Sequence, residues 1–108
     1  MKIYVGTIHN GEHDVHCFDG RTRYRLNPRY DLRNHSPDGF CWGYAGSGPA
    51  QLALALVADH AGDAIAQKVY QDFKSIVIAR LNGDVGFSLT SDDIQRVLDA
   101  IDATLLPP

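Results

Sequence analysis

Residues 34–56 read NHSPDGFCWGYAGSGPAQLALAL and contain the strongest structural signals of the chain. Pro49 suits a first helical turn, where backbone amides have no intrahelical partner, so we expect a helix to begin at about Pro49. Between residues 50 and 58 only Gln51 is polar. Because such a helix has no polar face, it must be buried on nearly every side. Gly62 then offers the left-handed position at which helices commonly end.

The aromatic residues before this helix alternate with small ones. Phe40, Trp42 and Tyr44 are separated by Cys41 and Gly43. In an extended backbone successive side chains point to opposite faces, so the three rings would share one face. The pattern predicts a strand that packs its aromatic side on the core.

The glycine-rich corner Gly46-Ser47-Gly48-Pro49 has two interpretations. Free amides at a helix N-terminus attract anions, so Gly46, Ser47 and Gly48 form a possible anion site, which with a nearby histidine would suit a small anion-binding enzyme. Alternatively, the glycines let the chain turn sharply, so that the helix lies tight against the sheet. The structural interpretation is favoured, because the P-loop, dinucleotide and nucleophile-elbow patterns do not fit this spacing.

Upstream of this corner the pattern is that of an antiparallel meander. Alternating, β-branched segments predict strands at residues 2–8, 14–18 and 22–26. Asn10-Gly11 is the strongest short hairpin signal, and Asp19-Gly20 marks a second turn. Residues 27–39 are dense in turn residues and predict a loop.

Two further helices and a short strand follow the buried helix. Apolar spacing predicts a second helix from Asp63, antiparallel to the first, and a strand at residues 85–89. Thr90 with Asp93 three residues later resembles a capping box and predicts a third helix. We therefore predict a single α+β domain over residues 1–108. It has an antiparallel sheet of about 4–5 strands with three helices on one face, in the order β-β-β-(β)-α-α-β-α.

Basic residues are concentrated around the third predicted strand. Residues 1–46 carry six basic and five acidic residues, whereas the remainder carries four basic and eight acidic ones. The candidate binding residues are Arg21, Arg23, Arg25, Arg29, Arg33, Tyr24 and Tyr30. Arginines interleaved with tyrosines can clamp phosphates and stack bases, so nucleic acid is one possible partner. The same side chains suit an acidic protein surface, or a solvated sheet face partly paired with aspartates.

The last predicted helix carries an acidic face, formed by Asp92, Asp99 and Asp102, opposite its apolar stripe. Two of these acids lie near the helix C-terminus, where the helix dipole disfavours negative charge. The face is therefore either simply solvated or an acidic surface for docking or for nucleic-acid mimicry.

The histidines and cysteines show no metal-binding spacing. On a strand His13 and Cys17 share a face while His16 points away, which matches no standard zinc motif. We expect neither a metal nor another cofactor, and we interpret His35 as a hydrogen-bonding loop residue rather than a general base. No apolar run reaches the length of a membrane span or resembles a signal peptide, so we expect a cytoplasmic protein with Cys17 and Cys41 as free thiols.

The quoted stretch also resembles a known family. Residues 34–56 match the pattern NHSPxGFxWGYxGSGPAQLALAL, which resembles the signature of an uncharacterised domain family of bacteria, phages and other mobile elements. The likeness extends to Tyr4 and Gly6 near the start and to the segments around residues 70–74 and 89–94. No activity is assigned to this family, so the resemblance implies no catalytic residues.

These observations favour a binding module over an enzyme, because no pattern pairs an activated nucleophile with a base. The mobile-element setting implied by the resemblance suggests an accessory protein that binds and blocks a host macromolecule, such as a CRISPR or other defence component. The partner would be a host protein or a protein–nucleic acid complex. A nucleic-acid-binding accessory protein is the alternative, and both a monomer and a homodimer remain open.

Overall fold

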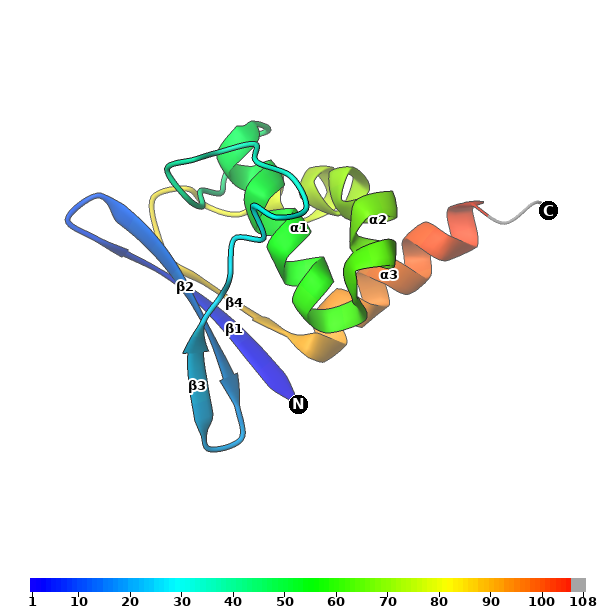
Figure 1. The fold of residues 1–108 in the computed structure, drawn as a ribbon, viewed down its shortest axis with the longest axis horizontal. Helices are drawn as coiled ribbons and strands as arrows, with labels where there is room; N and C mark the ends of the chain where they lie inside the picture. Colours follow the sequence, from blue (N-terminus) through cyan, green and yellow to red (C-terminus); the bar gives the residue numbers. More distant parts are fainter. Residues whose placement is uncertain (106–108) are drawn as a thin grey trace.

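The computed structural model describes residues 1–105, so the last three residues of the predicted domain lie outside the described residues. Its elements are β1 (Lys2–His9), β2 (Glu12–Asp19), β3 (Thr22–Arg25), α1 (Ser47–Ala61), α2 (Asp63–Ile76), the 3-10 turn η1 (Ile78–Arg80), β4 (Phe87–Thr90) and α3 (Ser91–Leu105). The three helices lie on one side of the sheet (Figure 1). The predicted α+β class and the order of its elements are confirmed.

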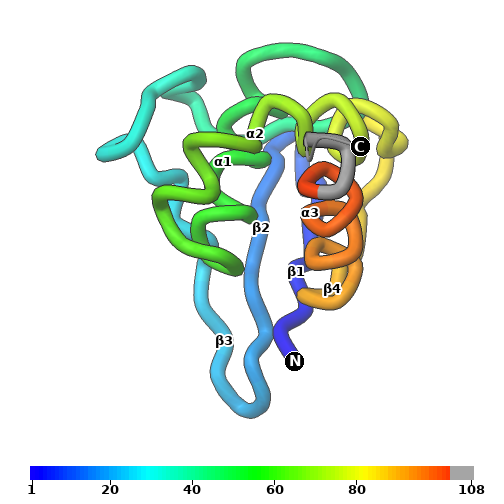
Figure 2. The backbone as a smooth tube through the Cα atoms, turned by 90° about the vertical axis from the view of Figure 1, so that its right-hand side faces the viewer, coloured from blue at the N-terminus to red at the C-terminus, as the bar shows by residue number. Residues whose placement is uncertain are grey.

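The four strands form one antiparallel sheet in the order β3-β2-β1-β4. The β1–β2 turn is the predicted one, and Asn10 and Gly11 adopt left-handed φ angles of 51° and 80°. Two successive positive φ angles give the turn whose twist matches that of the flanking strands. The β2–β3 hairpin extends past the helices at one end of the molecule (Figure 2).

Helix α1 lies between the sheet and α2 and forms the centre of the core (Figure 1). It begins at Ser47, two residues before the predicted start, and Gly62 ends it with a φ angle of 93°. Every residue from Gly48 to Ala58 is buried, and Leu52 is fully inaccessible. Burying one such leucine stabilises the fold by roughly 1.5–3 kcal/mol. The predicted central helix is confirmed.

The strand predicted at residues 40–44 is wrong, because this segment forms no strand. Trp42 is buried, but Tyr44 is 50% exposed, so the rings do not share one face. The alternation breaks at Gly43, whose φ angle is 92° and whose amide donates to the carbonyl of Ile78. A Cβ atom on Gly43 would lie 2.5 Å from the backbone of Gly83. The close approach of two loops, rather than strand pairing, therefore determines the backbone conformation of residues 40–44.

The third helix starts as predicted. The amide of Thr90 donates to the Asp93 carboxylate at 2.9 Å, and the amide of Asp93 donates to the Thr90 hydroxyl at 3.0 Å. These reciprocal bonds satisfy two amides at the start of the helix, as in a capping box. They also lower the pKa of Asp93 below its ordinary value. The second helix begins at Asp63 as predicted, and α2 ends at Ile76, shortly before η1.

Candidate functional site

The helices cover one face of the sheet, and the opposite face, called the outer face, lies open (Figure 1). The inner face carries buried residues such as Tyr4, Val15 and Cys17. The strand register places on the outer face Ile3, Val5, Thr7, Asp14, His16, Phe18, Arg23, Arg25 and Ser88. The outer face therefore combines apolar, aromatic and basic side chains.

Phe18 lies at the centre of this mixture. It stands between Ile3 on β1 and Arg23 on β3 in the strand register. Ile3 and Phe18 are each 38% exposed, and the guanidinium of Arg23 lies 5.5 Å from the centre of the Phe18 ring. A guanidinium at this distance is attracted to the ring face by about 0.5–1 kcal/mol at an exposed site. The contact arranges a cation and an exposed ring side by side.

The five candidate arginines do not form one surface. Arg23 and Arg25 lie on the outer face, and Arg21 lies at the tip of the β2–β3 hairpin. Arg29 and Arg33 belong to the loop between β3 and α1, which runs on the helix side. The basic region predicted from the sequence is thus divided between two sides of the molecule.

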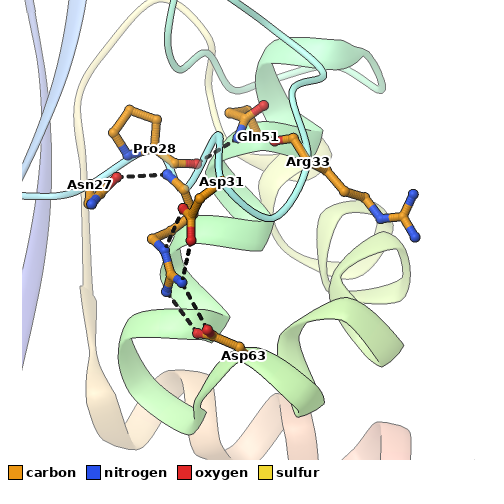
Figure 3. Close-up of polar contacts among 7 residues, drawn as sticks. Asn27, Pro28, Asp31, Arg33, Gln51 and Asp63 are labelled. Atoms are coloured by element: carbon orange, nitrogen blue, oxygen red, sulfur yellow. Dashed lines mark hydrogen bonds and ion pairs between the residues drawn. The ribbon is translucent and has the colours of Figure 1, made fainter.

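Arg29 is held by two carboxylates (Figure 3). Its guanidinium bonds Asp31 at 3.0 Å and both oxygens of Asp63 at 2.8 and 2.9 Å, and its side chain is 21% exposed. The Arg29 amide donates to Asn27 at 2.9 Å, in a left-handed backbone with φ 62°. Hydrogen bonds from Arg29 hold the pKa of Asp31 and Asp63 below the ordinary value. Arg29 thus ties the loop to the start of α2.

Tyr24 faces the helices rather than the solvent. Its hydroxyl donates to Asp59 on α1 at 2.8 Å, and the Tyr4 hydroxyl donates to the same carboxylate at 2.6 Å. Lys2 lies 3.3 Å from Asp59 and completes the cluster. Burial raises the pKa of both tyrosines, so the hydroxyls remain donors. The cluster links the sheet to α1, and Tyr24 does not present its ring as a stacking surface.

Gln51 shows a role that the sequence analysis missed. Its amide nitrogen donates to the carbonyls of Pro28 and Arg33 at 2.6 and 3.0 Å. Its amide oxygen accepts from the amides of His35 and Ser36 at 2.8 and 3.3 Å. The side chain is fully buried. One polar residue on α1 therefore holds the loop at several points between residues 28 and 36. Its position in an otherwise apolar helix was the sequence signal from which this role could have been predicted.

Two other loop residues are also engaged. The His35 ring lies 2.7 Å from the Tyr70 hydroxyl on α2, which agrees with a hydrogen-bonding role for this histidine. The Tyr30 hydroxyl donates to the carbonyl of Pro37 at 3.3 Å, while its ring stays 39% exposed. The His35 contact holds the loop against α2, and the Tyr30 contact joins two parts of the loop.

The glycine corner is tightly packed. Gly46 caps α1, and a side chain there would enter the Tyr44 ring. Gly48 is buried, and a Cβ atom on it would lie 2.7 Å from the Cβ atom of Cys41. Ser47 lies between them at the first position of the helix. The close approach at Gly48 requires glycine for packing, whereas the half-exposed Tyr44 ring beside Gly46 can move aside. Anion binding at Gly46, Ser47 and Gly48 stays a prediction.

The remaining candidates lie apart from the outer face. Asp99 and Asp102 line a groove between α2 and α3, and Asp92 lies outside it. The side chain of His13 faces inward and packs edge-on against Trp42 at 4.7 Å. Among the residues whose side chains are described, no group of histidine, cysteine and acidic side chains could hold a metal ion. Within residues 1–105 no helix has the length and apolar character needed to cross a membrane.

The described residues form a small α+β domain in which the helices cover one face of the antiparallel sheet. The chain belongs to a family of unknown function (DUF6166), whose model matches residues 4–100. No curated protein and no solved structure matches the chain. Its function therefore has to be inferred from the surfaces themselves.

Proposed function

We propose that the chain is a non-enzymatic binding module and that its outer face contacts an acidic surface of a partner protein. The observation that carries the proposal is the exposed pair Ile3 and Phe18 beside Arg23 on a sheet face that no described element covers. Aromatic residues and arginine are enriched at protein interfaces and dominate their energetics. An aromatic side chain that stays 38% exposed leaves apolar surface available to a partner.

The charge of this region favours an acidic partner. Arg21, Arg23 and Arg25 are exposed on one hairpin, and Asp14 neutralises only Arg25 among them. Complementary charges raise the association rate and orient the partner, and physiological salt screens them beyond about 8 Å. The resemblance to a mobile-element family makes a host defence component, such as a CRISPR protein, the first class of partner to test.

The size of the outer face limits the affinity it can provide. Strand lengths and spacings give it an area on the order of 400 Å². A stable interface buries about 800 Å² on each partner, so the contact must extend onto the β2–β3 hairpin or remain transient. The protruding position of that hairpin makes such an extension possible (Figure 2).

The experiment is a quantitative pull-down from nuclease-treated bacterial lysate with three chains. These are the wild type, the double variant Phe18→Ala/Arg23→Glu, and the control Arg80→Glu, which reverses an exposed charge on η1. We expect an acidic protein to be retained by the wild type and the control and to be lost by at least about tenfold from the double variant. Equal retention by all three chains, or no retained protein, would refute the proposal.

Nucleic acid is the competing partner, because an exposed ring beside a guanidinium also suits base stacking. Filter binding to single-stranded and double-stranded DNA and RNA distinguishes a nucleic-acid partner from a protein partner. Retention that falls steeply with salt and is lost in Phe18→Ala/Arg23→Glu would assign the outer face to nucleic acid instead.

A further inference from the structure

A groove of about 220 Å³ lies between α2 and α3, on the helix side of the molecule. Its apolar lining comes from Ala61, Ile65, Val69 and Leu98. Its volume is below the roughly 300–1,000 Å³ of sites for small molecules and cofactors, so it suits one or two side chains of a partner. The groove is separate from the outer face and its proposed partner.

Ile65 is the clearest anomaly of this groove. It lies on α2 next to the buried Ala66, yet it remains 47% exposed. Leaving about half of an isoleucine side chain in water forgoes on the order of 1 kcal/mol of the stabilisation that full burial provides. An apolar side chain from a partner would recover this contribution on binding.

The rim of the groove is mainly acidic. Asp99 and Asp102 on α3 face a single lysine, Lys68 on α2. The amide of Gln95 donates to Asp99 at 2.9 Å, and its oxygen lies 2.7 Å from the His60 ring. These bonds fix the α3 wall of the groove.

The helix itself does not account for these acids. Asp102 lies at the start of the last turn of α3, which holds no basic residue, and Asp99 lies about one turn earlier. Negative charge in the last turn of a helix is unfavourable by about 0.3–1 kcal/mol, so this cost applies to Asp102. An external cation would offset this cost.

We propose that this groove docks a short amphipathic segment of a partner protein, in which an apolar side chain is followed within one helical turn by lysine or arginine. The apolar side chain contacts Ile65 and Leu98, and the cation pairs with Asp99 and Asp102. Helices that lie in apolar grooves use anchors at this spacing. The net negative charge of the rim selects a basic segment over an acidic one.

The test is selection from a displayed library of random 16-residue peptides against the intact chain, followed by fluorescence anisotropy on the selected peptides. We expect them to contain an apolar residue with lysine or arginine three or four positions away. Ile65→Asp should weaken their binding by at least about tenfold, which corresponds to 1.4 kcal/mol. Asp102→Lys should weaken it by about threefold or more and reduce its salt dependence.

The chain supplies a matched control for each variant. Ile76→Asp changes a residue on the same helix with a similar exposure of 44%, and Asp72→Lys reverses an exposed acid outside the groove. Both should leave peptide binding within about twofold of the wild type. Thermal melts of all four variants establish that each one is folded.

Three results would overturn the proposal. The first is that no peptide is selected, and the second is that the selected peptides lack basic residues or still bind Ile65→Asp. The third is a concentration-dependent dimer in analytical ultracentrifugation that Ile65→Asp dissociates, which would make a second copy of the chain the occupant.

Discussion

Strand β3 and the loop between β3 and α1 both carry arginines, and these arginines have opposite roles. The side chain of Arg25 on β3 is 73% exposed and pairs with one carboxylate, Asp14. That of Arg29 in the loop is 21% exposed and is shared between Asp31 and Asp63. The first arrangement leaves charge available to a partner, and the second uses it to hold the fold together.

The loop is an ordered part of the structure because it is fixed at two places. Gln51 on α1 bonds four of its backbone groups, and Arg29 joins it to α2. A long loop without regular structure must satisfy its backbone polar groups by such contacts wherever water cannot reach them. The difference between the two regions can therefore be measured as a difference in stability.

The largest effect is expected from Gln51→Leu. The substitution keeps a buried apolar helix but leaves four backbone groups of the loop without their partner. Each unsatisfied buried group costs about 1–3 kcal/mol, and partial detachment of the loop restores some contacts with water. We expect a loss of about 3 kcal/mol in the free energy of unfolding by urea.

Gln71→Leu is the control for this prediction, because Gln71 is exposed on α2. It should change the free energy of unfolding by less than about 0.5 kcal/mol. If Gln51→Leu behaved like the control, the loop would not depend on its anchor.

Arg29→Met tests the second anchor through pH. The pKa values of Asp31 and Asp63 are lowered by Arg29, so their contribution to stability is present above the ordinary aspartate pKa. It is lost as the pH falls through the lowered values. The difference in melting temperature between wild type and variant should therefore be full at neutral pH and should shrink below about pH 4.

Arg96→Met provides the comparison, because Arg96 is 76% exposed and lies 3.6 Å from Asp93. The pKa of Asp93 is lowered mainly by the Thr90 backbone, so this variant should show little change at any pH. A difference between wild type and Arg29→Met that did not depend on pH would show that the two carboxylates do not act through Arg29.

Local signals predicted most of the fold. The Asn10-Gly11 turn and the Thr90/Asp93 cap depend on neighbours within three residues, so the sequence alone reveals them. Residues 40–44 failed as a strand because Gly43 packs against Gly83, and sequence periodicity contains no information on a contact over forty residues.

The candidate site was predictable in part. A period of two places Arg23 and Arg25 on one strand face, and the structure agrees. Of the two carboxylates that hold Arg29, Asp63 lies 34 residues away, and no local pattern indicates this pairing. The role of Gln51 was open to prediction, since it is a polar residue in an otherwise apolar buried helix and a buried amide must find hydrogen-bond partners.

The smallest effect is expected from Arg23→Ala, which tests an arginine of the outer face instead of an arginine of the loop. Arg23 contacts the Phe18 ring on an exposed face, so the loss of the guanidinium removes a contact of about 0.5 kcal/mol and leaves no buried group unpartnered. The free energy of unfolding should therefore stay within about 0.5 kcal/mol of the wild type, with no dependence on pH between about 4 and 7. Urea unfolding of Arg23→Ala and Arg29→Met side by side measures the contrast. A loss for Arg23→Ala as large as that for Arg29→Met would mean that the outer-face arginine also serves the fold, and the argument for a free binding surface would fail.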